Sequence, residues 1–223
     1  MRTLFKTKYK IFMILIIVLL NLSYFSSCRK KTYNHFSGTI YNLSSNQGVE
    51  GAKVILEASK IVSGNLNNTF HKIAETQTDE EGKYLIEVEQ ELYIKFRIRV
   101  EKEGYHSYFT EFEPSEQIAD YIKNYPLAQV SYLKIKLKNN PPSYPDDLLK
   151  VKVEGINKLC TECCDENFVL FEGKDIDTEF FCNTVGGDTV RVNFITTTSG
   201  STNFSTRSYY CVPGETVEDY FYY

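Results

Sequence analysis

Apolar and polar residues alternate in short runs along most of the chain, and clusters of Gly, Asn and Asp separate these runs. The clearest alternation covers residues 93–100 and places four apolar side chains on one face: Ile94, Phe96, Ile98 and Val100. Lys and Arg occupy the other face. A period of two is typical of a strand with one buried and one wet face, so the pattern predicts an all-β protein.

The first half of the chain contains enough such runs for one antiparallel sandwich. The predicted strands are residues 36–41, 52–59, 70–78, 83–88, 93–102, 106–112 and 131–138. A sandwich of about 100 residues needs roughly seven strands at this spacing. Residues 115–125 are predicted to form a short helix or a connecting loop.

The second half predicts a smaller β domain over residues 148–223. Its predicted strands are residues 149–153, 168–172, 179–182, 189–195, 206–211 and 217–222. Gly186, Gly187 and Asp188 form a hairpin signal between two of them. Residues 139–147 contain three of the six prolines, which indicates a semi-rigid linker between this domain and a first domain over residues 35–138.

The N-terminus has the composition of an export signal. Four basic residues precede an unbroken apolar run over residues 11–20, and no acidic residue comes before Glu50. Ten residues in a helix cover about 15 Å, roughly half the hydrocarbon thickness of a bilayer. Residues 1–27 are therefore predicted to be a signal peptide and not a membrane span.

Residues 25–28 read Phe-Ser-Ser-Cys and resemble the lipobox of bacterial lipoproteins. The resemblance implies that Cys28 is acylated, so that the membrane becomes a partner through a lipid anchor, with residues 28–34 as a tether. The alternative is an ordinary signal peptide or an uncleaved anchor. Some lipoproteins of Bacteroidetes-type bacteria carry an acidic stretch here that directs them to the cell surface. This chain has Arg29, Lys30 and Lys31, which favours the periplasmic side of the outer membrane.

Net charge argues against nucleic acid as a partner. The whole chain has 25 basic and 29 acidic residues, a formal charge of −4, and the predicted signal peptide holds four of the basic ones. A mature chain with an acidic excess is a poor binder of phosphate backbones. Aromatic content is high, with 17 Tyr and 15 Phe, which serves either core packing or a recognition surface.

The first domain resembles the carboxypeptidase regulatory-like family, a transthyretin-like β-sandwich. Residues 36–41 leading to 49–54, then 76–84 and 100–105, carry the resemblance in the family's order. Its turn and core residues in this sequence are Gly51, Asp79, Gly82, Tyr84 and Gly104. Such domains act beside other domains as accessory or recognition modules, so the resemblance implies a fold and no catalytic residues. Three successive acids at residues 79–81 offer too few oxygens for calcium alone.

The second domain is rich in cysteine. It contains Cys160, Cys163, Cys164, Cys182 and Cys211. In an oxidising compartment such patterns read more often as disulfides than as metal sites, although zinc and free thiols remain alternatives. The first pairing predicted is Cys182 with Cys211, and the second is Cys160 with Cys163 or Cys164. The odd number leaves one thiol unpaired.

No catalytic signature is found in the sequence. His35, His71 and His106 are the only histidines, and each is predicted to lie on a wet strand face. A nucleophile elbow, a zinc-protease helix, a phosphate loop and a dinucleotide fingerprint are all missing. We expect no enzyme activity, no cofactor and no metal.

Three functions from different classes remain open. The first is a non-catalytic envelope lipoprotein that binds a protein or glycan partner. The second is an assembly subunit that resembles fimbrillin-type pilins, although those mature by cleavage after an Arg and the next Arg after Arg29 is Arg97. The third is an unrecognised hydrolase, which would require two carboxylates across a cleft.

Overall fold

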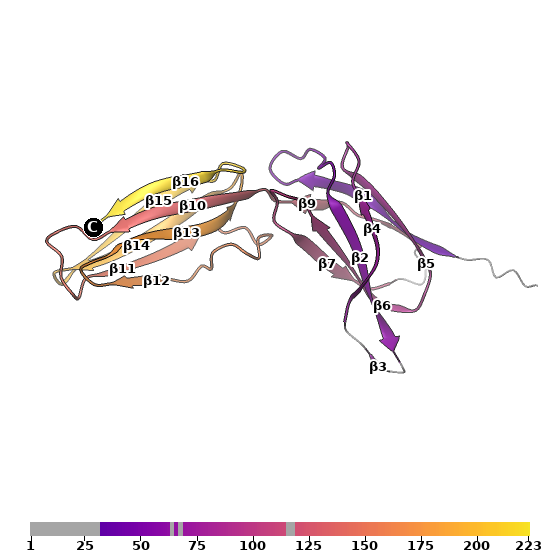
Figure 1. Ribbon diagram of the computed structural model, residues 1–223, viewed down its shortest axis with the longest axis horizontal. Coiled ribbons are helices and arrows are strands. Elements are labelled where there is room, and N and C mark those ends of the chain that lie inside the picture. Colours follow the sequence, from indigo (N-terminus) through magenta and orange to yellow (C-terminus); the bar gives the residue numbers. More distant parts are fainter. Residues whose placement is uncertain (1–31, 63–64, 67–68, 115–118) are drawn as a thin grey trace, which may run out of the picture. The chain divides into compact units, whose positions relative to one another are not determined.

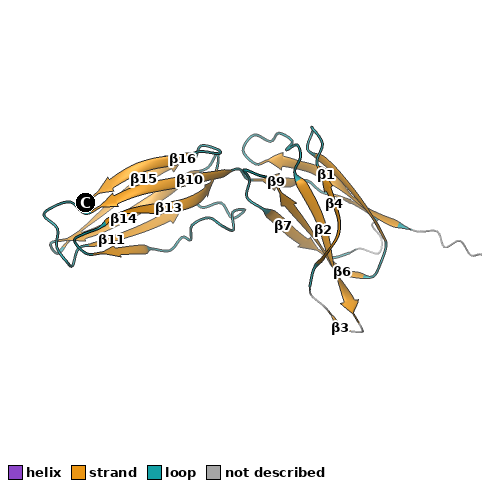
Figure 2. Cartoon of the chain, viewed as in Figure 1, coloured by secondary structure: helices purple, strands orange, loops and turns teal. Residues whose placement is uncertain are grey.

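The computed structural model describes residues 32–62, 65–66, 69–114 and 119–223 (Figures 1 and 2). Every regular element within these ranges is a β-strand, which confirms the predicted all-β class. No helix in the described ranges is long and apolar enough to cross a membrane. The predicted signal peptide, and Cys28 with it, lie outside the described residues.

Two sheets near the N-terminal side form the first sandwich. One sheet has the order β5-β1-β8, with β9 also pairing with β1. Its strands are β1 (Tyr33–Asn42), β5 (Lys83–Glu89), β8 (Asp120–Ile122) and β9 (Tyr125–Leu127). The other has the order β3-β2-β6-β7, with β4 pairing with β2. Its strands are β2 (Lys53–Val62), β3 (Asn65–Leu66), β4 (His71–Gln77), β6 (Tyr93–Glu101) and β7 (Tyr108–Phe112).

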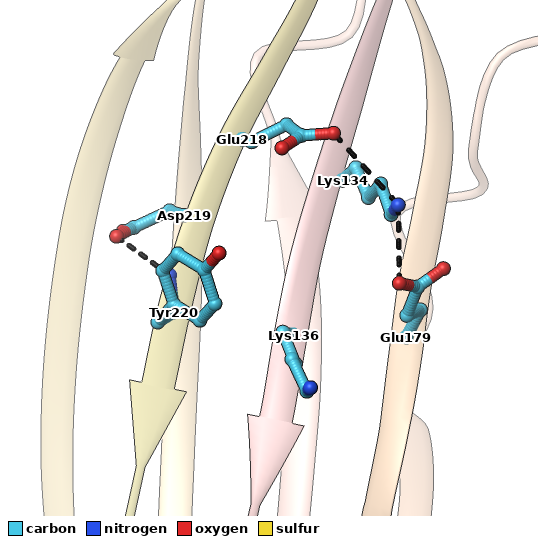
Figure 3. Close-up of a pocket in the computed structure, with 6 residues that line it drawn as sticks. All are labelled: Lys134, Lys136, Glu179, Glu218, Asp219 and Tyr220. Carbon is cyan, nitrogen blue, oxygen red and sulfur yellow. Dashed lines mark hydrogen bonds and ion pairs between the residues drawn. The ribbon is translucent and has the colours of Figure 1, made fainter.

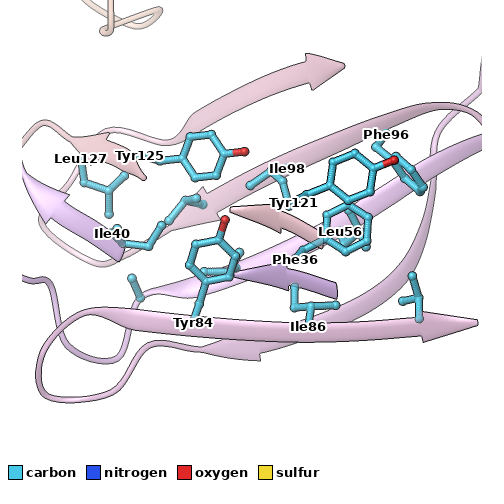
Figure 4. Packing of buried hydrophobic residues seen from close by; sticks show 14 of the residues in the cluster. Phe36, Ile40, Leu56, Tyr84, Ile86, Phe96, Ile98, Tyr121, Tyr125 and Leu127 are labelled. Carbon is cyan, nitrogen blue, oxygen red and sulfur yellow. The ribbon is translucent and has the colours of Figure 1, made fainter. Parts of the chain in front are cut away.

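Aromatic rings and aliphatic side chains together fill the core between these two sheets (Figure 4). Phe36 stacks on Tyr121 with ring centroids 4.8 Å apart, and it meets the edge of Phe96 at 5.0 Å. Offset and edge-to-face contacts of this kind contribute beyond simple burial of area. The alternation that placed Phe96, Ile98 and Val100 on one face of β6 therefore identifies true core residues.

The turn between β4 and β5 forms as its residues predict. The Asp79 carboxylate oxygen Oδ1 accepts hydrogen bonds from the backbone N–H groups of Glu81 at 3.1 Å and Lys83 at 2.7 Å. Gly82 takes a φ of 76°, and a Cβ there would lie 2.4 Å from the carbonyl oxygen of Ile40. Both the positive φ and the close approach require glycine at this position.

Two further sheets form the second sandwich. The sheet of order β13-β10-β16 contains β10 (Val130–Lys138), β13 (Asp177–Val185) and β16 (Thr216–Tyr222), with β10 and β16 parallel. The sheet of order β12-β11-β14-β15 contains β11 (Leu148–Glu154), β12 (Val169–Glu172), β14 (Thr189–Thr198) and β15 (Ser201–Tyr210). The core between these two sheets mixes aliphatic and aromatic side chains, and Phe194 and Phe221 stack in it at 3.9 Å.

The strand β10 corrects the predicted domain boundary. It was expected to complete the first sandwich, but it pairs with β13 and β16, and its apolar face packs in the second core. Residues 139–147 therefore connect β10 with β11 inside the second sandwich and do not separate two domains. Alternation shows which face of a strand is buried, but it does not identify the sheet that the strand joins.

Each strand predicted from the alternation overlaps an observed strand, and the three that were missed are short. The missed strands are β3, β8 and β9. The strand β8 falls within residues 115–125, where a helix or loop was expected, β9 begins at the end of that segment, and each of the two strands has three residues. A three-residue strand is too short to display a period of two, so its pairing with β1 is decided by the tertiary structure.

Candidate functional site

The outer face of the sheet β13-β10-β16 combines charged and aromatic side chains. Strand pairing places Lys134 between Phe181 and Glu218, and the next outward row places Lys136 between Glu179 and Tyr220. Residues directly opposite one another on neighbouring strands share a face of the sheet. We call these residues, together with Tyr132, Lys138, Asp177 and Tyr222, the aromatic-charged face.

Alternating charges neutralise one another along this face (Figure 3). The Lys134 Nζ lies 3.0 Å from Glu179 Oε1 and 3.7 Å from Glu218 Oε1. The hydrogen bond with Glu179 holds the pKa of Lys134 above its ordinary value. The hollow that these side chains line with Tyr220 has a volume of about 40 Å³, which is room for little more than water. The face is therefore nearly flat at this point, and a larger pocket of about 370 Å³ opens at its edge beside Glu179 and Phe181.

Three large aromatic side chains stand exposed on this flat surface. Phe181, Tyr220 and Tyr222 are between 52% and 56% exposed. Phe181 stacks on Tyr132 with ring centroids 5.6 Å apart, and the rings of Tyr220 and Tyr222 lie 6.1 Å apart. Neighbouring rings restrict one another, so a partner would meet an apolar surface that is already ordered.

Side chains from β15 fix the backbone that carries Tyr220. Arg207 Nη1 donates hydrogen bonds to Asp219 Oδ2 and to the carbonyl oxygen of Tyr220, each at 2.7 Å. The Tyr209 hydroxyl donates to the same Asp219 oxygen at 2.6 Å. Burial works to raise the pKa of Asp219, but the hydrogen bonds from Tyr209 and Arg207 outweigh it and leave the pKa below its ordinary value. The ionised carboxylate thus supports one end of the face.

The first sandwich also has a charged outer face, on the side of β6 where the alternation placed Lys and Arg. Arg97 lies 2.6 Å from Glu111 and 3.6 Å from the largely buried Glu57, and its guanidinium sits 3.9 Å above the ring of Phe70. Arg99 holds the other Glu57 oxygen at 3.0 Å. Paired charges cover this face, and among its large apolar side chains Phe109 remains exposed.

The cysteines form two disulfides in the second sandwich. Cys160 bonds to Cys163, and Cys164 bonds to Cys182. The predicted pairing of Cys182 with Cys211 is wrong. The segment between β11 and β12 follows β13, as the hydrogen bond from Asn183 to the carbonyl of Glu162 shows, and this brings Cys164 to Cys182.

Among the cysteines that the structure describes, Cys211 is the unpaired one. Its backbone bonds to Gly187 and Asp188 hold it beside the turn between β13 and β14, within the apolar core. Burial raises the pKa of this thiol, so it is a poor nucleophile.

His106 was expected on a wet surface, and this expectation is wrong. The side chain belongs to the segment between β6 and β7 and is only 5% exposed. Its Nε2 lies 2.9 Å from the carbonyl oxygen of Thr184, and its Nδ1 lies 3.4 Å from Cys160 Sγ. Sequence spacing gives no sign of this contact, because 54 residues separate the two.

The other predicted site residues stay apart from these clusters. His35 lies between the carboxylates of Asp120 and Glu87 on the first sandwich, and His71 is exposed. The turn and core residues of the family resemblance all lie in the first sandwich. They are Gly51, Asp79, Gly82, Tyr84 and Gly104, and all three glycines take positive φ. Their role here is structural.

Comparison with known proteins places the chain only at the level of fold. No family model matches the sequence, and no curated protein matches it. The TIE protein of Bacillus anthracis aligns at 11% identity over 85% of this chain and 34% of its own length, with a TM-score of 0.37. This chain therefore spans about a third of that protein.

Two other solved structures that align with this chain belong to proteins of different function. The shaft pilin SpaA from Lactobacillus rhamnosus GG aligns at 7% identity over 86% of this chain and 97% of its own length, with a TM-score of 0.34. The catechol 1,2-dioxygenase from Acinetobacter sp. ADP1 aligns at 10% identity over 47% of this chain and 55% of its own length, also at 0.34. All three TM-scores lie below 0.5, so these likenesses assign no family and no activity to the chain.

Proposed function

We propose that the chain is a non-catalytic binding protein of the bacterial cell envelope, which recognises a protein partner through its aromatic-charged face. The observation that carries the proposal is the exposure of Phe181, Tyr220 and Tyr222 on one flat sheet face. Exposed apolar patches rimmed by polar groups mark interaction sites more often than chance, and aromatic residues are enriched where proteins meet.

The chemistry of the face favours a protein partner over nucleic acid. Its lysines are already paired with Glu179, Glu218 and Asp177, so they offer no free positive field for phosphates. Interleaved charges of both signs select a partner by complementary pairing, while the rings supply apolar contact area.

The envelope location is part of the proposal and rests on the sequence. Support comes from the apolar run over residues 11–20 and from the lipobox-like residues 25–28, which predict export and a lipid on Cys28. We place the protein on the periplasmic side of the outer membrane. The carboxypeptidase regulatory-like resemblance over residues 36–138 supports the same role, because domains of that family accompany other domains as accessory modules.

The test is capture from envelope extracts of the native host by the immobilised full chain. We expect the double variant Tyr220→Ser and Tyr222→Ser to lose at least about tenfold in captured partner, since central aromatic contacts are often worth over 2 kcal/mol. The matched control is Phe204→Ser, which removes a 78% exposed ring from the opposite sheet. Equal capture by both variants would reject the face as the binding site.

Pre-treatment of the extract identifies the partner class. A protein partner predicts that protease abolishes capture and that periodate oxidation leaves it intact. The reverse result would replace the protein partner with a glycan on the same face.

A second candidate function is an assembly subunit, and strand β15 favours it. This ten-residue strand lies at the edge of its sheet, and Phe204 projects from it into solvent. Long exposed edges are templates for strand addition from another copy. Phe204→Lys should then disperse oligomers measured by light scattering, while the Tyr220 and Tyr222 variant should not. A monomer at every concentration would reject this candidate.

A further inference from the structure

We propose that reduction of the Cys160–Cys163 disulfide opens a binding site for one zinc ion, with His106, Cys160 and Cys163 as ligands. This goes beyond the proposed binding function and is independent of it. The ligand atoms of the three residues all lie within 4.8 Å of one another. Two thiolates and an imidazole form a donor set that selects zinc over calcium or magnesium, because those two cations prefer oxygen donors.

The imidazole of His106 has one nitrogen available for this role. A carbonyl oxygen only accepts hydrogen bonds, so the 2.9 Å contact with the Thr184 oxygen requires a proton on Nε2. In the neutral ring, Nδ1 then carries the lone pair. Cys160 Sγ lies 3.4 Å from Nδ1 and 3.6 Å from Nε2, so it sits beside the ring, and an ion bound by both atoms requires the ring or the sulfur to shift. A hydrogen bond from the second ring nitrogen to a backbone carbonyl is the usual support for a metal-binding histidine.

Backbone contacts hold the ligand residues in place before any ion arrives. The His106 N–H donates to the Ala128 carbonyl at 2.9 Å, and the Cys160 N–H donates to the Asn157 carbonyl at 3.0 Å. Ala128 and Cys160 lie in one small buried cluster with Val185. These bonds fix the backbone at two of the three ligand residues, and the third, Cys163, is partly exposed.

The redox step uses an external dithiol as reductant. The dithiol gives two electrons and two protons to the disulfide, its own sulfurs join, and Cys160 and Cys163 become thiols. Zinc binding then releases the two thiol protons to solvent and forms two zinc–sulfur bonds and one bond to Nδ1. The fourth position of a tetrahedral ion stays open to water or to a partner's side chain.

The experiment is a zinc titration of the purified full chain, oxidised and after reduction with dithiothreitol followed by desalting without oxygen. Bound zinc is counted by native mass spectrometry. We expect no zinc on the oxidised protein and one zinc on the reduced protein. Cobalt in place of zinc should give thiolate-to-metal charge-transfer absorption, which reports the sulfur ligands directly.

Matched variants locate the ion. Cys164→Ser with Cys182→Ser removes the second disulfide and should leave one zinc bound, while Cys163→Ser should abolish the charge-transfer absorption of a two-sulfur site. His106→Gln keeps a polar side chain and should weaken zinc at least about tenfold.

Two results would overturn the proposal. The first is zinc on the reduced protein that disappears in the Cys164 and Cys182 variant and persists in Cys163→Ser. The second is a reduced protein that binds no zinc although circular dichroism shows that it stays folded.

Discussion

The two sandwiches of this chain reach stability by different means. The first has no cysteine in its described residues, and its core contains the rings of Phe36, Phe96 and Tyr121 in mutual contact. The second also mixes rings with aliphatic side chains in its core, but it has two disulfides in addition. Disulfides are a common supplement to a small hydrophobic core.

The outer faces of the two sandwiches also differ in how many large aromatic side chains they expose. On the first sandwich, arginines and glutamates pair so closely that Glu57 is largely buried between Arg97 and Arg99. On the second, paired lysines and glutamates leave Phe181, Tyr220 and Tyr222 in solvent. Ion pairs at exposed positions contribute little to stability, so the charged residues of the second face add little to the free energy of folding.

The largest effect should come from the aromatic core of the first sandwich. Phe96→Ala removes a fully buried ring that contacts Phe36, Tyr93 and Tyr121, and should lower the free energy of unfolding by about 3–5 kcal/mol. Chemical denaturation measures this change. Phe204→Ala is the matched control and should cost less than about 0.5 kcal/mol. Similar values for the two variants would remove the distinction between core and surface rings.

Removal of the Cys164–Cys182 disulfide should have the next largest effect. The bond joins residues 18 positions apart, and replacing both cysteines with alanine should cost about 3 kcal/mol. The Cys160–Cys163 pair closes a loop of only three positions, so its removal should cost about 1.5 kcal/mol less. Thermal unfolding of both variants shows which of the two loses more stability. A larger loss for the Cys160–Cys163 pair would contradict this account and indicate that the pair supports a larger part of the fold.

Alanine substitutions at two glycines with similar φ values separate the cost of backbone strain from the cost of steric clash. Gly82 and Gly104 have φ values of 76° and 80°, but a Cβ on Gly104 meets nothing within 4 Å. Gly104→Ala should therefore cost only the left-handed backbone energy, about 1–2 kcal/mol. Gly82→Ala adds a clash with the Ile40 carbonyl and should cost at least about 1 kcal/mol more. Equal losses in the free energy of unfolding, measured by chemical denaturation, would show that the turn at Gly82 moves enough to avoid the clash.

The smallest effect concerns acid stability at the aromatic-charged face. The ordinary pKa of an Asp side chain is about 4, and the pKa of Asp219 in the folded protein lies below that value. The ionised carboxylate therefore stabilises the fold at pH values above about 4. This stabilisation is lost as the pH falls through the lower, folded pKa. Asp219→Asn should cost about 1 kcal/mol at pH 7, and the difference from wild type should shrink below about pH 4. Glu218→Gln, which loses only an exposed partner at 3.7 Å, should show a smaller difference.

Local sequence signals predicted the strands and the main turn but not the long-range contacts. Alternation identified β6 because its period is intrinsic to the strand, and Asp79 with Gly82 identified a turn because its chemistry is local. The placement of β10, the pairing of Cys164 with Cys182 and the burial of His106 depend on segments distant in sequence. Pattern and spacing do not encode such contacts, which explains why these three expectations were wrong.

The most direct test of the proposed function is site-specific photocrosslinking of the full chain in its native envelope. A benzophenone amino acid replaces one exposed aromatic residue at a time: Tyr220 on the aromatic-charged face, Phe204 on the opposite sheet, or Phe109 on the first sandwich. The account predicts one strong crosslinked product from position 220 and none of that mass from positions 204 and 109. The same product from position 204 or 109, with none from 220, would contradict it.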